Sequence, residues 1–225
     1  MGRQSYVWRS LMALLEKDLI EELRARYALG SLLMFSLVTL AVVSFSVGSF
    51  YPDSSIHAAL LWVIVFFTGM SGLGRSFIKE EEAKTSVLLS LAASADLVFF
   101  AKLVFNAVIM LAVSSLVLAL YIILMGIAGN LLLLWLVVSL GSLGMAGGTT
   151  LLAAVVAQAG NQALLLPVLA LPVLMPLLMV AVNASRLALE GASFGEVFGL
   201  LAFLLSYAVV IVAVSMLLFD FVWHN

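Results

Sequence analysis

The amino-acid sequence predicts an all-α integral membrane protein that crosses the bilayer six times. Of its 225 residues, 65% are hydrophobic and only 10% are charged, whereas about a quarter of the residues in a soluble domain are charged. Six separate windows are also long and apolar enough to cross about 30 Å of hydrocarbon. These few polar side chains could not cover the surface of a water-soluble globule. Lipid must therefore be the main solvent.

Composition also excludes several classes of function. The net charge is −2, and no basic patch interleaved with aromatic residues exists, so we expect no nucleic-acid partner. The sequence contains no cysteine, which excludes disulfides, thiolate metal sites and cysteine nucleophiles.

Residues 1–29 are predicted to form a cytoplasmic amphipathic helix in the membrane interface. Its apolar side chains recur every three or four residues: Trp8, Leu11, Met12, Leu15, Leu19, Leu23 and Tyr27. Its other face is charged: Arg9, Glu16, Lys17, Asp18, Glu21, Glu22, Arg24 and Arg26. Two compatible interpretations remain open. The helix is a topological anchor, or it is an elbow helix that braces a transporter half and touches a cytoplasmic partner. We expect it to remain uncleaved, because the apolar stretch that follows has full spanning length.

Residues 30–225 form the predicted transmembrane domain. Its six windows are Gly30–Phe50, Ala58–Gly74, Leu103–Met125, Leu131–Ala157, Ala163–Asn183 and Val197–Phe219. None contains Asp, Glu, Lys, Arg or His. We expect the second to continue to Phe77, and the fourth is long enough to tilt or break.

The basic residues predict the orientation of these spans. Nine of the ten Lys and Arg residues fall on one side: Arg3, Arg9, Lys17, Arg24, Arg26, Arg75, Lys79, Lys84 and Lys102. Only Arg186 falls on the other side, where it is expected to form a small cap with Asn183, Glu190 and Glu196. The positive-inside rule then places both termini and the loop at 75–102 in the cytoplasm.

The loop at 75–102 carries the largest charge cluster, which comprises Arg75, Lys79, Glu80, Glu81, Glu82 and Lys84. One interpretation is a solvated loop that fixes topology. The other is a coupling helix that docks into a groove of a soluble ATPase and carries nucleotide-driven motion into the membrane.

Proline and glycine mark two further candidate sites in the spans. Pro167, Pro172 and Pro176 predict that the fifth span kinks or unwinds, either as a moving element on a substrate path or as static packing. Close helix packing is predicted at Gly144 and Gly148, which have G-x-x-x-G spacing, and at Gly69 and Gly72.

Catalysis and self-powered transport are not expected. Ion-coupled pumps keep ionisable side chains at membrane depth, and these windows have none. The sequence also lacks the H-E-x-x-H pattern of zinc proteases and the phosphate-binding loop of nucleotide-binding proteins. We interpret His57 and His224 as residues at the membrane interface rather than as ligands. We therefore predict no catalytic residue, no metal site and no directly bound cofactor, with the energy source in another chain.

Four segments together resemble one known family. They are Lys17–Arg26, Phe67–Glu82, Ser90–Lys102 and Leu166–Leu178. In order and spacing they are similar to the N-terminal helix, second span, following loop and fifth span of the CcmB family, also called haem exporter protein B. This chain departs from the family pattern at Leu91–Asp96, which lacks proline, and at Gln158–Gln162, which lacks a basic residue.

The resemblance implies an ABC-2-type permease half in the bacterial inner membrane, acting in cytochrome c maturation. It implies a cytoplasmic ATPase subunit resembling CcmA that binds the ATP, membrane subunits resembling CcmC and CcmD, and a periplasmic haem chaperone resembling CcmE. Haem is then the ligand handled by the complex. Haem ligation normally uses His, Cys or Tyr, so the absence of histidine within the windows favours a subunit that transmits motion over one that holds haem.

Two alternative functions and one question of assembly remain open from the sequence. The chain could be the permease of another ABC-2 exporter, with a lipid-linked, peptide or drug substrate, or a non-transporting membrane scaffold. Six helices also form only half of a translocation unit, so the second half is either another copy, giving a homodimer, or a different subunit.

Overall fold

A computed structural model describes residues 11–20, 26–47, 53–73, 94–157 and 162–223, and all the helices named here lie in these ranges. Residues 11–20 form one short helix. The six longer helices are α2 (Arg26–Val47), α3 (Ser54–Leu73), α6 (Ala95–Met125), α7 (Leu131–Ala157), α8 (Gln162–Leu189) and α9 (Phe194–Trp223). Each of the six is long and apolar enough to cross a membrane, which confirms the predicted fold class.

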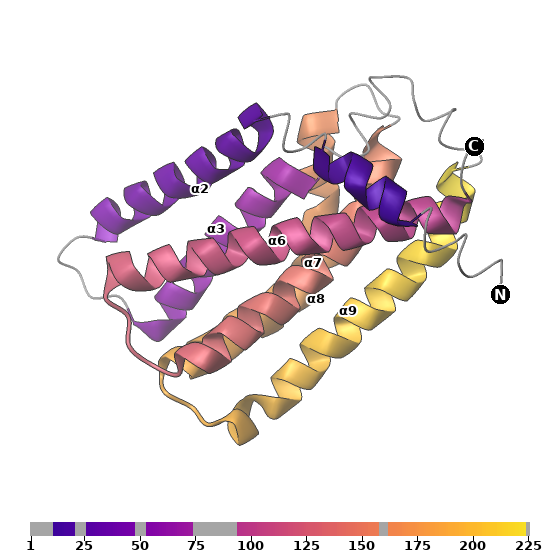
Figure 1. Ribbon diagram of the computed structural model, residues 1–225. Coiled ribbons are helices and arrows are strands. Elements are labelled where there is room, and N and C mark those ends of the chain that lie inside the picture. The colour runs from indigo at the N-terminus through magenta and orange to yellow at the C-terminus, as the bar shows by residue number, and fades with distance from the viewer. Residues whose placement is uncertain (1–10, 21–25, 48–52, 74–93, 158–161, 224–225) are drawn as a thin grey trace.

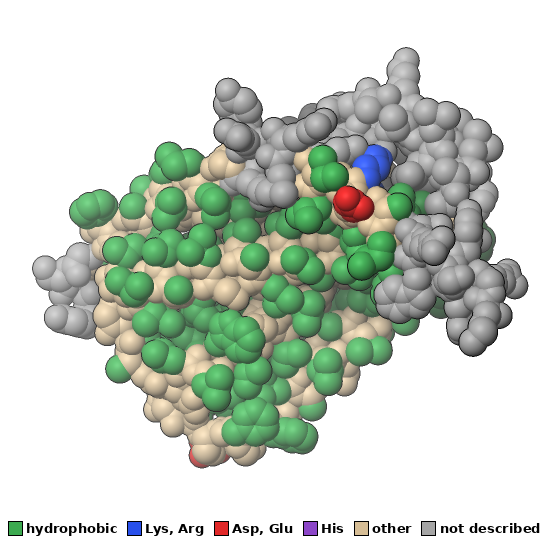
Figure 2. Space-filling view, viewed as in Figure 1, with side chains coloured by type: hydrophobic (Ala, Val, Ile, Leu, Met, Phe, Trp, Pro, Cys, Tyr) green, Lys and Arg blue, Asp and Glu red, His purple; other side chains and the backbone are tan. Residues whose placement is uncertain are grey.

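The long helices form an elongated bundle in which α7 has the most buried position (Figure 1). Helix α7 packs against α6, α8 and α9, and 61% of its spanning window is buried, against 17% for α2 at the edge of the bundle. Large apolar side chains cover the visible long face of the bundle, and the Lys, Arg, Asp and Glu colours appear only towards its ends (Figure 2). Such a surface matches a hydrocarbon solvent rather than water.

Five of the six long helices extend beyond the windows expected from sequence, whereas α7 coincides with its window. Helix α2 begins at Arg26, so residues 26–29 belong to it and not to the expected N-terminal amphipathic helix. Helix α3 begins at Ser54, where Asp53 caps it, and α8 continues past Asn183 to Leu189. Helix α6 begins at Ala95, so the loop expected to reach Lys102 is shorter, and residues 95–102 are the first two turns of the helix. No proline or glycine interrupts this stretch, and Asp96 in the first turn complements the helix dipole. The expected extension of the second span to Phe77 lies outside the described residues.

At one end of the bundle, the turn between α6 and α7 is bonded to the end of α8 and the turn that follows it. Asn130 donates its backbone N–H to the Ala188 carbonyl (2.9 Å) and its side-chain amide to the Ala192 carbonyl (3.2 Å). Gly129 adopts a φ of +143°, and a Cβ there would lie 2.8 Å from the carbonyl oxygens of Ala188 and Leu189. Only glycine fits this close approach.

Candidate functional site

Helix 11–20 lies near the N-terminal end of α6 (Figure 1), to which it is bonded through the side chain of Asp18. Leu11 and Asp18, which are two turns apart on one side of the helix, are both buried. Met12 and Leu19 on another side are 62% and 52% exposed. The sequence placed Asp18 on the solvated charged face. That placement is wrong, because a basic residue of α6 draws its carboxylate inward.

This basic residue is Lys102. Its Nζ lies 2.7 Å from Asp18 Oδ1, and the two side chains are only 5% and 6% exposed. The other carboxylate oxygen, Asp18 Oδ2, is buried with no hydrogen-bond partner in the part of the chain that the structure describes. Removing one partner of such a buried pair is strongly destabilising, by about 3–5 kcal/mol, because the remaining charge is uncompensated.

One turn further along α6, a second polar contact joins α6 to α7. The side-chain amide of Asn106 donates to Thr150 Oγ1 at 3.0 Å, and both residues are buried. Thr150 in turn donates to the Ala146 carbonyl at 2.6 Å within α7. Residues four apart lie on the same side of a helix, so one face of α6 carries both Lys102 and Asn106.

The same end of α6 also packs against the C-terminal part of α9. The rings of Phe99 and Phe219 have centroids 5.0 Å apart, and both side chains are fully buried. Aromatic pairs at such a distance add about 0.5–1.5 kcal/mol beyond their burial. The start of α6 is therefore held by helix 11–20 and α9 as well as by α7.

The residues predicted to couple the chain to an ATPase precede this end of α6 in sequence. Arg75, Lys79, Glu80, Glu81, Glu82 and Lys84 all lie outside the described residues. The structure describes the two helices that flank their segment, α3 ending at Leu73 and α6 beginning at Ala95.

Helix α8 remains helical through its three prolines. Pro167, Pro172 and Pro176 all lie inside the single helix Gln162–Leu189, so α8 does not unwind there, and the expected kink stays a prediction. In this stretch the Val173 carbonyl accepts a hydrogen bond from the Tyr207 hydroxyl of α9. This bond joins α8 to α9 at the residue that follows Pro172.

The glycines of α7 lie against neighbouring side chains. A Cβ at Gly144 would approach Leu177 Cδ1 to 2.3 Å, and one at Gly148 would approach Leu174 Cδ2 to 3.1 Å. In α3, a Cβ at Gly69 would meet the Met110 side chain at 3.0 Å, and one at Gly72 would meet the Leu32 side chain at 2.1 Å.

Gly141 makes room for an aromatic ring that sequence analysis did not single out. A Cβ at Gly141 would lie 2.1 Å from Trp62 Cη2. The indole Nε1–H of Trp62 donates to Ser185 Oγ at 2.9 Å in a buried contact that links α3 to α8. The sequence did contain a signal for this contact. Trp62 lies within an apolar window, and a buried indole N–H needs a hydrogen-bond acceptor.

Two histidines were interpreted as interfacial residues. His57 lies in the first turn of α3 and is partly buried; its Nδ1 is 3.2 Å from the hydroxyl oxygen of Tyr121. The Tyr121 hydroxyl is also placed to donate to the His57 carbonyl at 3.1 Å. His224 lies outside the described residues. In the described ranges no group of three His, Cys, Asp or Glu side chains could hold a metal ion.

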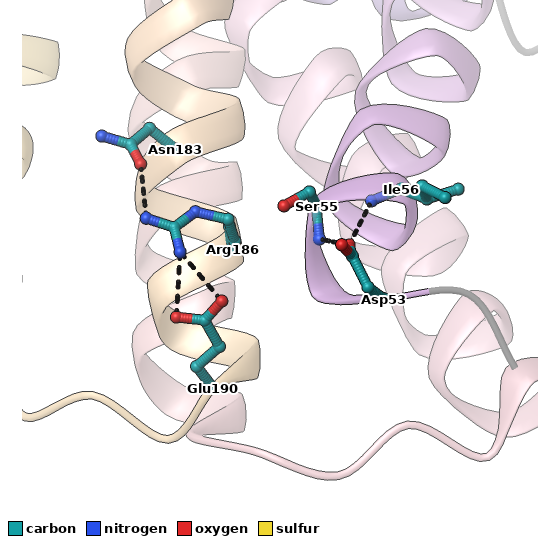
Figure 3. Close-up of polar contacts among 6 residues, drawn as sticks. All are labelled: Asp53, Ser55, Ile56, Asn183, Arg186 and Glu190. Carbon is teal, nitrogen blue, oxygen red and sulfur yellow. Dashed lines mark hydrogen bonds and ion pairs between the residues drawn. The ribbon is translucent and has the colours of Figure 1, made fainter.

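A smaller polar group lies near the C-terminal end of α8 (Figure 3), at the end of the bundle away from helix 11–20 (Figure 1). Arg186 Nη1 contacts both carboxylate oxygens of Glu190 at 2.9 and 3.0 Å, and its Nη2 donates to Asn183 Oδ1 at 3.2 Å. Glu196 accepts instead from Ser193 Oγ at 2.8 Å, so the expected cap is divided into two separate contacts.

Asp53 at this end caps α3 (Figure 3). Its Oδ1 accepts the backbone N–H groups of Ser55 at 2.6 Å and Ile56 at 3.2 Å. These bonds, the one from Ile56 first, hold the pKa of the Asp53 carboxyl below its ordinary value of 3.8. The exposed side chain thus stays ionised at the positive end of the helix dipole.

Comparison with known proteins found one family. The family model described as "CcmB protein" matches residues 9–220. No curated protein matches the chain. The match begins just before helix 11–20, spans both partners of the Asp18–Lys102 pair and ends within α9.

Proposed function

Because the chain belongs to the CcmB family, we propose that it is the membrane subunit of an ABC transporter that exports haem for cytochrome c maturation. The match over residues 9–220 carries the proposal, and the six apolar helices support it. The partners are a CcmA-like cytoplasmic ATPase, CcmC-like and CcmD-like membrane subunits and a CcmE-like periplasmic haem chaperone. The termini and the charged segment face the cytoplasm of a bacterial inner membrane, with Arg186 on the periplasmic side.

The distribution of charge supports a motor in another chain. Charged residues of the six long helices lie close to the helix ends: Arg26, Asp96, Lys102, Arg186, Glu196 and Asp220. The middle of each helix has no Asp, Glu, Lys or Arg. Ion-coupled transporters place ionisable groups at membrane depth, so ATP hydrolysis in a soluble partner is the energy source that fits this chain.

We propose that the motion enters through Glu80–Glu82. This acidic stretch lies in the segment that joins α3 to α6, so a partner bound there pushes on the ends of two spanning helices. One of these is α6, which contacts helix 11–20, α7 and α9 near its start. A displacement at the start of α6 therefore acts on three further elements.

Within this complex the subunit transmits motion and does not hold haem by its own axial ligand. Cysteine is missing, and His57 and His224 are the two histidines. His57 lies in the first turn of α3, at an end of the bundle rather than at membrane depth. The pure chain, titrated with haem, should give no stoichiometric histidine-ligated spectrum, and such a spectrum would contradict this part of the proposal.

The test is a charge reversal of Glu80, Glu81 and Glu82 to lysine in the co-expressed complex. We expect the ATPase subunit to be lost from the purified membrane subunits, and ATP-dependent haem delivery with it. The matched control reverses Glu190, an exposed carboxylate in a pair that contributes about 0–1 kcal/mol, and should leave ATPase binding unchanged. Unaltered binding and turnover in the triple variant would favour a scaffold. A wild-type complex without haem-handling subunits would favour a different ABC-2 exporter.

A further inference from the structure

Two polar contacts lie on consecutive turns of one face of α6. Lys102 reaches helix 11–20 through Asp18 (2.7 Å), and Asn106 reaches α7 through Thr150 (3.0 Å). All four side chains are buried. A short helix at the end of the bundle is thus joined through α6 to the most buried helix of the protein.

The Asp18–Lys102 pair is poorly explained by stability alone. Desolvating two charges can cost more than their attraction returns, and well-packed apolar replacements of buried ion pairs are often equally stable or more stable. Asp18 also leaves one buried carboxylate oxygen without a partner in the described residues, a further cost. In some proteins a buried polar or charged contact fixes the register of a helix, because it is satisfied at one position where apolar packing allows several.

Few side chains of helix 11–20 are fully buried. Leu11 and Asp18 are buried, Leu14, Leu15 and Lys17 are partly buried, and the apolar Met12, Leu19 and Ile20 are exposed. Helices this short are marginal on their own in water, since nucleation is unfavourable. The contact with Lys102 is therefore well placed to decide where this helix sits.

We propose that Asp18 and Lys102 are positioning residues that fix helix 11–20 to α6, so that this helix, α6 and α7 move as one body during the ATP-driven cycle. This proposal rests on the function proposed above, because it concerns how motion passes from the charged segment into the helix bundle. Motion that reaches the start of α6 passes outward through Lys102 to the interfacial helix and inward through Asn106 to α7.

The first test needs no transport assay. Amide hydrogen exchange of residues 11–20 is measured in the complete complex for wild type, Asp18→Asn and Asp18→Leu/Lys102→Met. Both variants should exchange faster in this helix, by about tenfold or more, while α8 keeps its wild-type rates. Glu16→Gln, an exposed change on the same helix, should leave exchange unchanged. Wild-type protection in both variants would overturn the proposal.

The second test separates positioning from folding. The apolar pair Asp18→Leu/Lys102→Met removes both charges together, so it should assemble and keep its thermal midpoint even if single variants fail to fold. We expect it to retain ATP hydrolysis but to lose most of the haem delivered per ATP consumed. A wild-type ratio in this variant would show that the pair is structural only, and would overturn the proposal.

The two proposals fail differently. If the wild-type complex delivers no haem with ATP, the proposed function fails, and the exchange measurement still reports whether Lys102 positions helix 11–20. If wild type delivers haem and the apolar pair does so equally well, the positioning role fails and the proposed function stands.

Discussion

Adding one methyl group at Gly141 should disturb the contact between α7 and α3. The new Cβ would lie 2.1 Å from Trp62 Cη2 and 3.0 Å from both Cζ2 and Cζ3. The indole of Trp62 has little room to move, because this side chain is 2% exposed and its Nε1 is hydrogen-bonded to Ser185 Oγ at 2.9 Å. In Gly141→Ala, either the helices separate or the Trp62–Ser185 hydrogen bond lengthens.

The expected cost follows from three terms. Overpacking of a filled core costs about 1–3 kcal/mol, and a weakened buried hydrogen bond adds about 1 kcal/mol. Alanine is better than glycine inside a helix by about 1 kcal/mol, which offsets the second term. We therefore expect Gly141→Ala to lower the free energy of unfolding by about 1–3 kcal/mol.

Gly199→Ala is the matched control, because Gly199 is inside α9 and a Cβ there meets nothing within 4 Å. It should stabilise by up to about 1 kcal/mol. The assay is thermal unfolding of the purified chain in detergent. In a Trp62→Phe background the smaller ring should absorb part of the clash, so that the cost of Gly141→Ala falls. Equal midpoints for Gly141→Ala and Gly199→Ala would refute the reasoning.

Three further measurements test other parts of the structure. Tyr207→Phe removes the donor to the Val173 carbonyl and should cost about 1 kcal/mol, with faster hydrogen exchange around Val173; unchanged exchange would contradict the contact. The pKa of Asp53 is lowered on folding, so its stabilisation is present above pH 3.8 and is lost as pH falls through the lowered pKa. The unfolding midpoint of Asp53→Asn should lack this acid-dependent loss. Because the chain has no cysteine, single cysteines report topology: an impermeant maleimide should label Ser193→Cys in intact cells but not Glu16→Cys, and the opposite result would invert the orientation.

Sequence alone predicted the spans because lipid constrains them strongly. A helix in hydrocarbon must be long and apolar, so the window Leu131–Ala157 coincides with α7. Helix ends were predicted less well, because they depend on local contacts. Asp53 starts α3 before its apolar window, and α6 begins at Ala95, since charged residues are tolerated in a helix outside the hydrocarbon.

Long-range polar pairs could not be predicted from the sequence. Asp18 and Lys102 are 84 positions apart, and helical periodicity alone placed Asp18 on the charged face. Trp62 and Ser185 are 123 positions apart. Each side chain could be singled out as a polar group beside an apolar stretch, but pairing them requires the three-dimensional packing. The coupling role of Glu80–Glu82 stays a prediction.

The bond between the α6–α7 turn and the α8–α9 connection sets where this bundle can deform. Asn130 attaches the first turn to Ala188 and Ala192, so the two helical hairpins are pinned together at the end opposite helix 11–20. Rotation of one hairpin against the other would then pivot near Asn130, and it would separate the Phe99–Phe219 contact between α6 and α9 at the far end. We expect small shifts at the pinned end and the widest opening at the end where the charged segment joins α3 to α6.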